Sequence, residues 1–433
     1  LARINPVNTK EFVTVGDDFT VRVWDRVERK LKRMVKLDCM SRAVCYSPDG
    51  NYIAVGCGGD VPGKEKEGPI GGFKVLQDED LAVASEGRDS RQWITDVKYS
   101  QDGKVLAVAS RDSNIYFYDP EDGYRLANQF KKPEAPVLHM DFSDDASFLR
   151  VNDADKNLHF CDVTTGMKIP AASELKDIDW ATVSCPFSWE MQGVHNPYAD
   201  GTEVAHVTVN KARDLCVATD NFGKLKLRTF PVKSTGYGAK THRAHMGLAT
   251  CSQFCPGITE EGADEPDRTL LTTGGLDRTI LQWKVTKVDQ DKEAVKYDAK
   301  QTDGNVKTEM MLTFPEDEAK GEDGKEGGTK DGQAYLDDEA AVLEDQPKPW
   351  TATIVEPDQP PPHDQLKPDV EIQLEHVYGY NAQTSRNNLF YTGNLEIIYP
   401  AATVGVIYNK SEHSQKFFRG HTGPIISLAI DHT

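Results

Sequence analysis

Long apolar runs and a surplus of positive charge are both missing from this sequence of 433 residues. No stretch approaches the roughly 20 consecutive apolar residues that a membrane-spanning helix needs, and the first residues show no signal-peptide pattern. The 50 Lys and Arg residues stand against 69 Asp and Glu residues, which gives a formal net charge of −19. This balance disfavours a general nucleic-acid-binding surface. We therefore expect neither a membrane nor a nucleic acid as a partner.

Patterns typical of catalysis and cofactor binding are missing as well. No Ser-His-Asp or Cys-His arrangement stands out, and no glycine-rich loop joins a strand to a helix in the manner of a phosphate-binding loop. Cys251 and Cys255 lie near His242 and His245, but their spacing matches no familiar set of zinc ligands. The sequence predicts no enzyme, no cofactor and no metal site.

The cysteines do not follow the regular spacing of a disulfide framework. Most of them lie in apolar, strand-like runs, which in a chain of this length indicates buried, reduced thiols in a cytosolic protein. The eight residues are Cys39, Cys45, Cys57, Cys161, Cys185, Cys216, Cys251 and Cys255.

What the sequence does contain is one short unit that recurs. Residues 272–283 form a β-rich run that ends in small residues, a turn with an aspartate, and a second run that closes on tryptophan. The same layout is found at 14–25, 107–119 and 151–162. The turn residues Asp112 and Asp155 are 43 positions apart (155 − 112), and a period of about 40–45 residues with four strands per unit is typical of a β-propeller. The sequence predicts an all-β fold of four-stranded antiparallel blades, with six units up to residue 285 and the first one incomplete.

The composition changes after these units. Between residues 316 and 345 there are twelve acidic residues and three basic ones, with frequent glycine and no period. Such a segment cannot bury enough apolar surface to offset its ordering entropy, so it predicts a disordered or extended linker. Two roles remain open for it: a flexible spacer, or a contact for a basic partner.

The details of the repeated unit resemble WD40 repeats. The Ser-Pro-Asp-Gly turn at 47–50, the Val-Trp-Asp ending at 23–25 and the Gly-His pair at 420–421 carry this resemblance. It implies that the turn aspartate braces each blade through hydrogen bonds and that the closing tryptophan packs between sheets. Departures exist: Ala244 precedes His245 where a glycine is usual, and Tyr118 and Cys161 stand in place of tryptophan. The residues that match the family positions are Asp18, Asp112, Asp155, Asp277, Trp24 and Trp283.

A narrower resemblance covers most of the chain. The blocks 89–100, 179–182, 200–204 and 220–227 look like the second propeller of the echinoderm microtubule-associated protein-like family. Residues 377–408 are similar to its HELP motif, which in that family precedes a tandem pair of propellers. A HELP motif after a propeller implies a multi-module member of the family. The HELP-like residues are Tyr378, Gly379, Tyr380, Arg386, Asn387 and Asn388.

These patterns together predict the domain organisation. The chain begins at Leu1 inside a strand-like unit, so we expect a piece of a longer protein. The expected segments are 1–25, the last part of a preceding blade or the first blade of the propeller; 26–285, the propeller blades; 286–369, the acidic linker; 370–412, the HELP-like motif; and 413–433, the first strands of the next propeller.

The resemblance also implies a function. It points to a non-enzymatic scaffold that binds tubulin and neighbouring axonemal or cytoskeletal proteins, in the cytoplasm, the cytoskeleton and the axoneme of a cilium. Basic residues in loops are candidates for contacts with the acidic surface of tubulin, although ordinary solubilising charge is the favoured interpretation of any one of them taken alone. These candidates are Arg26, Arg29, Lys30, Lys32, Arg33, Lys131 and Lys132.

Two alternatives come from other classes of protein. A cytosolic WD40 adaptor that recruits peptides to a signalling or ubiquitin-ligase complex would have one propeller, an aromatic and arginine-rimmed central pocket and no HELP motif. A propeller enzyme would need clustered ionisable residues at its central channel, and the sequence shows none clearly.

Overall fold

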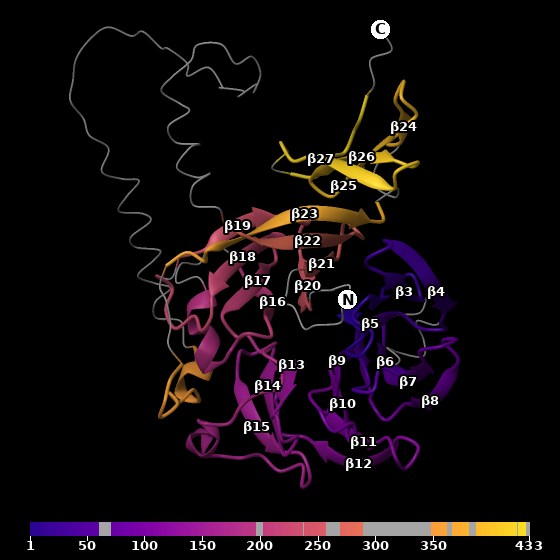
Figure 1. Ribbon diagram of the computed structural model, residues 1–433. Coiled ribbons are helices and arrows are strands. Elements are labelled where there is room, and N and C mark those ends of the chain that lie inside the picture. Colours follow the sequence, from indigo (N-terminus) through magenta and orange to yellow (C-terminus); the bar gives the residue numbers. More distant parts are fainter. Residues whose placement is uncertain are drawn as a thin grey trace, which may run out of the picture. The chain divides into compact units, whose positions relative to one another are not determined.

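The computed structural model describes residues 1–59, 71–195, 202–236, 238–256, 269–288, 348–361, 366–380, 387–421 and 423–429. Within these residues the structure is almost entirely antiparallel β-sheet, as predicted, with six sheets of four strands and one of three (Figure 1). The helices in this part of the chain are the short 3-10 helices η2 (Ala172–Leu175), η3 (Trp189–Val194) and η4 (Pro349–Ala352). No helix among them is long and apolar enough to cross a membrane.

The first blade extends further than the sequence predicted. It consists of β1 (Ala2–Ile4), β2 (Glu11–Val15), β3 (Thr20–Asp25) and β4 (Lys30–Lys36). The boundary expected at residue 25 is therefore wrong by one strand. The reason is visible in β4, where basic side chains dominate and most residues are exposed, so the strand has no apolar alternation by which the sequence could reveal it.

The next four sheets follow the same meander, in which neighbouring strands are consecutive in sequence. The second blade is β5 (Ser41–Tyr46), β6 (Tyr52–Cys57), β7 (Gly72–Gln77) and β8 (Val83–Gly87). The third is β9 (Ile94–Tyr99), β10 (Leu106–Ser110), β11 (Ile115–Asp119) and β12 (Arg125–Phe130). The fourth has three strands, β13 (Val137–Phe142), β14 (Phe148–Asp153) and β15 (Leu158–Asp162). The fifth is β16 (Val204–Val209), β17 (Leu215–Asp220), β18 (Lys224–Thr229) and β19 (Lys240–Arg243).

The sixth blade is completed by a strand from the HELP-like segment. Its first three strands are β20 (Ala249–Cys255), β21 (Thr269–Gly274) and β22 (Ile280–Lys287), and its outer strand is β23 (Val370–Tyr378). Val370, Ile372 and Val377 are buried in the same apolar cluster as Leu281 and Trp283. The boundary expected at residue 285 therefore divides a blade, because burial of this alternating apolar face joins β23 to it.

The six sheets follow one another around a common centre, with β1, β5, β9, β13, β16 and β20 as the innermost strands (Figure 1). The first and last blades meet: Ala2 and Phe12 share a buried cluster with Cys255 and Leu271. The backbone N–H of Ile4 also donates to the Gln253 side chain at 3.1 Å. Contact between the first and last blades closes the ring without a further blade in the described residues.

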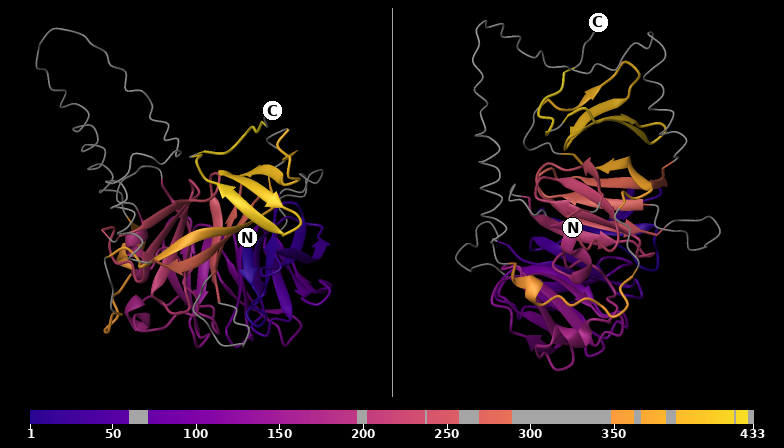
Figure 2. Two further views of the ribbon diagram at one scale, coloured as in Figure 1. Left: turned by 45° about the horizontal axis from the view of Figure 1, so that its top comes forward. Right: turned by 90° about the vertical axis from the view of Figure 1, so that its left-hand side faces the viewer.

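The seventh sheet belongs to the HELP-like segment. It consists of β24 (Phe390–Tyr391), β25 (Ile397–Ala401), β26 (Val404–Asn409) and β27 (Ser414–Phe418). The boundary expected at residue 412 is wrong, since β27 pairs with β26 rather than opening a new propeller. Gln415 accepts from the Val377 N–H at 2.8 Å and donates to its carbonyl at 3.1 Å, which holds this sheet next to β23 (Figure 2).

The cysteines differ in part from the prediction. Cys39 and Cys57 form a disulfide between the start of the second blade and its second strand, so the expectation of reduced thiols is wrong for this pair. The free cysteines are Cys45, Cys161, Cys185, Cys216, Cys251 and Cys255, and all except Cys45 are buried.

Candidate binding surfaces

The recurring unit at residues 272–283 takes part in a continuous chain of hydrogen bonds. His245 bonds Asp277 through Nδ1 at 3.0 Å and Thr272 through Nε2 at 2.9 Å. The fully buried Trp283 donates its indole N–H to the same Thr272 hydroxyl at 3.0 Å. Burial alone would raise the pKa of Asp277, but His245 and the donated hydrogen bonds hold it below its usual value. These hydrogen bonds link the β19–β20 connection, the β21–β22 turn and the strands β21 and β22 of the sixth blade.

Two other predicted turn residues have similar surroundings. Asp18 accepts from the Thr20 hydroxyl at 2.7 Å and pairs with Arg22 at 2.8 Å. Asp112 accepts from the Asn114 N–H at 3.1 Å and from the Tyr116 hydroxyl at 2.8 Å. Trp24 donates to Thr14 at 2.9 Å.

Asp155 departs from this arrangement. It is exposed, and the carboxylate that accepts from the turn amides is that of Asp153, at 3.1 Å from the Asp155 N–H and 2.9 Å from the Asn157 N–H. Asp220 does the same in the fifth blade, accepting from the N–H groups of Phe222 and Lys224. In these two blades the aspartate has moved to the end of the strand, where its side chain reaches the same amides. The position of Asp155 in the repeat made it a reasonable prediction, but its side chain does not brace the turn.

The HELP-like residues have diverse surroundings. Tyr378 is buried, donates to Gln282 at 2.7 Å and packs edge-on against Phe12 and Trp24. Gly379 has a φ of 76°, which favours glycine there. Tyr380 and Asn387 are exposed, while Asn388 is buried. Arg386 lies outside the described residues.

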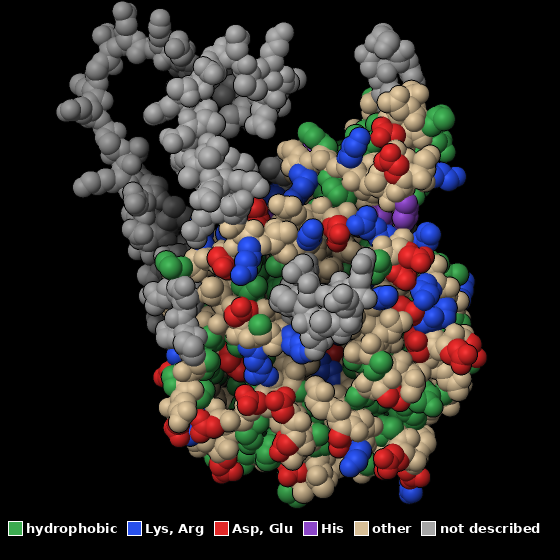
Figure 3. All heavy atoms as spheres, viewed as in Figure 1, with side chains coloured by type: hydrophobic (Ala, Val, Ile, Leu, Met, Phe, Trp, Pro, Cys, Tyr) green, Lys and Arg blue, Asp and Glu red, His purple; other side chains and the backbone are tan. Residues whose placement is uncertain are grey.

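The first group of predicted basic contacts is largely paired within the protein. Arg26 is 3% exposed and donates to the carbonyls of Thr9 and Pro256, so the expectation that it lies exposed is wrong. Arg29 pairs with Glu375 at 3.1 Å. Lys30 is exposed, 3.8 Å from Glu28. These residues lie at or near the β3–β4 turn, where Figure 3 shows acidic and basic side chains interleaved.

Lys32 and Arg33 share one buried carboxylate. Lys32 Nζ and Arg33 lie 2.6 Å from the two oxygens of Glu11, whose side chain is 5% exposed. Arg33 also pairs with Asp78 at 3.1 Å. The hydrogen bond to Glu11 raises the pKa of Lys32. Glu11 of the first blade thus holds both cations, and Asp78 of the second blade also holds Arg33.

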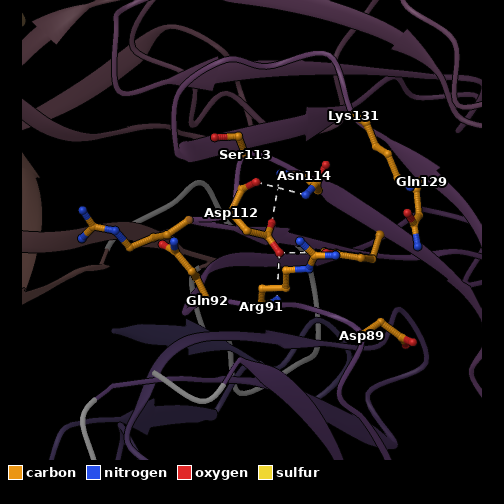
Figure 4. A pocket seen from close by; sticks show the side chains of 10 residues that line it. Asp89, Arg91, Gln92, Asp112, Ser113, Asn114, Gln129 and Lys131 are labelled. Atoms are coloured by element: carbon orange, nitrogen blue, oxygen red, sulfur yellow. Dashed lines mark hydrogen bonds between the residues drawn. The ribbon is translucent and has the colours of Figure 1, made fainter. Parts of the chain in front are cut away.

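The second group of predicted contacts borders an open hollow. Lys131 and Lys132 are exposed in the connection that follows β12. Lys131 lines a cavity of about 620 Å³ together with residues of the β8–β9 connection and the β10–β11 turn. Figure 4 shows Asp112 and Asn114 at its centre, with Gln92 on one side and Gln129 and Lys131 on the other. Lys132 is not among the lining residues.

Arginines missed by the sequence prediction complete this hollow. Arg91 and Arg111 line it and are exposed. Within the described residues no ion pair involves Arg91, Arg111 or Lys131. Arg111 and Arg42 lie over the ring of Trp93, at 5.6 and 4.3 Å from its centroid, a cation–π arrangement that orients both guanidinium groups. Arg91, Arg111 and Lys131 come from three separate connections, so no local sequence pattern could have grouped them.

The carboxylates in the hollow are occupied by internal donors. Asp112 accepts from the N–H of Arg91 at 2.9 Å as well as from Asn114 and Tyr116. Burial would raise its pKa, but these hydrogen bonds hold it below the usual value. Asp89 accepts from the Tyr118 hydroxyl at 3.0 Å. The groups left without a partner on the hollow are therefore mainly cations.

A buried ionic network, which the sequence reasoning missed, lies between the third and fourth blades. Asp141, fully buried, pairs with Lys98 at 2.7 Å and with Arg150 at 3.1 Å. Arg150 also pairs with Glu190 at 3.1 Å. Burial would raise the pKa of Asp141, but Lys98 and Arg150 hold it well below its usual range. The available signal was a charged residue in the middle of otherwise apolar strands, which marks a paired interior group.

Further ionisable residues line the innermost strands. Arg3 donates to Cys251 Sγ at 2.9 Å, and the rings of His139 and His206 lie 5.9 Å apart. Burial lowers the pKa of both histidines. Some ionisable side chains are therefore buried on the innermost strands, where the sequence showed no clear cluster. In the described residues, however, no group of three or more His, Cys, Asp or Glu side chains could hold a metal ion.

Comparison with known proteins places this fold in a family. The family model described as "Echinoderm microtubule-associated protein second beta-propeller" matches residues 3–285, and the model of the HELP motif matches residues 367–406. The second match includes β23, in agreement with the strand that completes the sixth blade.

Several curated relatives have similar sequences. Echinoderm microtubule-associated protein-like 2 of Mus musculus is 27% identical over 278 residues, covering 64% of this chain and 40% of the relative. Ciliary WD repeat-containing protein ctxp80 of Euplotoides octocarinatus is 29% identical over 290 residues, covering 63% and 38%. Echinoderm microtubule-associated protein-like 4 of Mus musculus is 28% identical over 277 residues, covering 63% and 26%. The chain therefore spans well under half the length of these relatives.

One chain of a solved structure, "Crystal Structure of Mitotic Checkpoint Complex", is similar to 66% of this chain, and the match covers 86% of that chain. The sequence identity is 13% and the TM-score is 0.49, a score too low to carry an argument. The propeller match is decisive, since it extends over more than half of the sequence. With its propeller and its HELP motif, the chain belongs to the echinoderm microtubule-associated protein-like family.

Proposed function

We propose that this chain is part of a non-enzymatic microtubule-associated scaffold that binds tubulin and neighbouring cytoskeletal proteins. The observation that carries the proposal is the family match over the propeller and the HELP motif together. The names of the relatives, microtubule-associated for some and ciliary for one, support a cytoskeletal location with a place in the cilium.

The architecture suits a scaffold. The third and sixth blades are pinned by turn carboxylates and buried aromatic residues, and the HELP-like strand β23 ties the segment after the propeller to the last blade. A rigid ring offers loops on both of its ends, and linkage of several such modules along a filament raises the effective concentration of each one.

Charge complementarity provides the binding mechanism. Microtubule surfaces are acidic, so exposed cations on an otherwise acidic protein steer it into register and repel wrong orientations. Such contacts weaken as salt screens them over about 10 Å at 0.1 M.

Co-pelleting with taxol-stabilised microtubules tests the proposal. The 433-residue chain is expected to pellet at low ionic strength and to be released progressively as salt rises. Failure to pellet at any salt concentration, with the protein shown to be folded by its β-sheet circular dichroism, would sink the proposal for this part of the protein.

A further inference from the structure

We propose that the hollow bordered by Arg91, Arg111 and Lys131 is a docking site for a glutamate-rich peptide segment. The inference rests on the proposed function, because it takes the acidic partner to be the microtubule surface. It adds to that function a defined site and the chemistry that the site recognises.

The first argument is the availability of charge. Most basic residues at the β3–β4 turn and on β4 already pair with carboxylates such as Glu11, Asp78 and Glu375. The three cations of the hollow have no ion-pair partner among the described residues. On a chain with a net charge of −19, unpaired cations grouped around one cavity are the feature that an anionic ligand recognises.

The second argument is the chemistry of the lining. Arg91 and Arg111 offer forked donors that fit carboxylates in bidentate fashion. Gln92 and Gln129 add amide donors on opposite sides (Figure 4). The two carboxylates of the lining, Asp89 and Asp112, already accept internal hydrogen bonds, so they repel an incoming carboxylate less than free acids do.

The third argument is preorganisation. The guanidinium of Arg111 lies over the Trp93 ring, and the backbone N–H of Arg91 is tied to Asp112 at 2.9 Å. The Arg111 guanidinium and the Arg91 backbone therefore start from anchored positions, which lowers the entropic cost of binding.

The size and position of the hollow favour a peptide. A volume of about 620 Å³ accommodates several side chains, far more than one carboxylate. Turns of an antiparallel meander alternate between its two ends, so the β8–β9 connection, the β10–β11 turn and the segment after β12 all lie at one end of the ring. Glutamates spaced along an extended segment can reach all three cations, whereas a long nucleic acid would meet the negative charge of the whole chain.

Fluorescence anisotropy with a labelled oligoglutamate peptide and the 433-residue chain tests the proposal. The wild type is compared with the triple variant Arg91→Ala, Arg111→Ala, Lys131→Ala. Only Arg111 among these side chains makes a defined contact with the fold, the stacking on Trp93, so the variant is expected to fold. Because each exposed ion pair contributes modestly, we expect the three changes together to weaken binding about tenfold or more.

A matched variant controls for net charge. Lys104→Ala, Arg125→Ala, Lys168→Ala removes three exposed cations from the opposite end of the third and fourth blades. It is expected to change peptide affinity less than about twofold. Equal weakening by both triple variants, or equal binding of an oligoglutamine peptide, would overturn the docking site.

A competition arm distinguishes the class of ligand. A single-stranded oligonucleotide of matched charge is expected to displace the peptide poorly, and displacement stronger than by unlabelled oligoglutamate would overturn the assignment to a peptide. The assay contains no microtubules. If both triple variants bind the peptide alike while the wild type still co-pellets with microtubules, the docking site alone is refuted. If the peptide binds as expected but the wild type does not co-pellet, the microtubule proposal is refuted.

Discussion

The two basic regions of this propeller, the run around β4 and the cations of the hollow, have opposite electrostatic surroundings. Around β4, the cations Lys32 and Arg33 converge on the buried Glu11. Around the β10–β11 turn, Arg91, Arg111 and Lys131 face a hollow whose carboxylates are occupied by other donors. A run of basic residues in a sequence therefore does not by itself mark a binding surface. What distinguishes the two regions is whether the fold brings a free carboxylate to each cation.

The largest expected effect comes from the most deeply paired cations. Asp141→Asn leaves Lys98 and Arg150 without their shared carboxylate in the interior. The free energy of unfolding is expected to fall by about 3–5 kcal/mol, measured by urea denaturation. Asp144→Asn is the control, because Asp144 is exposed and lies two residues after the end of β13. Its free energy of unfolding should stay within about 0.5 kcal/mol of the wild-type value. A similar loss in both variants would contradict the role of the network.

The sequence predicted those residues whose contacts lie within one repeat, and it missed those whose partners come from another blade. Local patterns such as the turn aspartate and the closing tryptophan identified Asp112, Asp277 and Trp283, because each depends on neighbours within one repeat. Asp141 depends on Lys98 from another blade, and no local pattern carries that pairing. Likewise β23 joins its blade across a segment of many residues, so its pairing could not be read from its own sequence.

The fourth blade shows how precisely a repeat can predict a residue's role, because two aspartates, Asp153 and Asp155, compete for the same position. Both aspartates lie in the same turn, and only the hydrogen bonds of the folded chain reveal that Asp153 accepts from the turn amides. The repeat located the turn, while side-chain geometry decided which carboxylate braces it.

The second prediction concerns pH and the strand that joins the HELP-like segment to the ring. Burial lowers the pKa of His376 from 6.5 to about 3. The unfolded chain therefore binds this proton more readily, so the stabilising contribution is complete above pH 6.5 and is lost as the pH falls towards 3. Between about pH 7 and pH 5 the loss from this group is about 2 kcal/mol.

His376→Phe removes that titration while keeping a ring against Tyr378. The variant is expected to show a flatter dependence of unfolding free energy on pH than the wild type, measured by urea denaturation across the range. His421→Phe, at an exposed position, is the control and should leave the curve unchanged. An unchanged slope in the His376 variant would count against a buried neutral imidazole.

The third prediction weakens the paired region directly. Glu11→Gln removes the carboxylate shared by Lys32 and Arg33. Because Lys32 is 41% exposed and solvent screens it, we expect a loss of only about 1 kcal/mol in unfolding free energy. Affinity for oligoglutamate at the hollow should not fall. A loss of peptide binding in this variant would indicate that the two regions are coupled.

The smallest effect is expected from converting the paired region into an unpaired one. The triple variant Arg91→Ala, Arg111→Ala, Lys131→Ala is the starting protein. Adding Glu11→Gln and Asp78→Asn to it removes both ion-pair partners of Arg33. Oligoglutamate affinity should recover by about twofold in anisotropy. The pair Asp144→Asn and Glu121→Gln, which removes the same charge from exposed sites, serves as the control, and equal recovery there would reduce the effect to net charge.

The measurement that tests the central claim most directly is microtubule co-pelleting of the wild type and of both triple variants across a range of salt concentrations. The account predicts that the wild type and the Lys104, Arg125, Lys168 variant pellet alike at low salt and are released together as salt rises. The Arg91, Arg111, Lys131 variant should remain largely in the supernatant at the same salt. Indistinguishable pelleting of all three proteins would contradict the account.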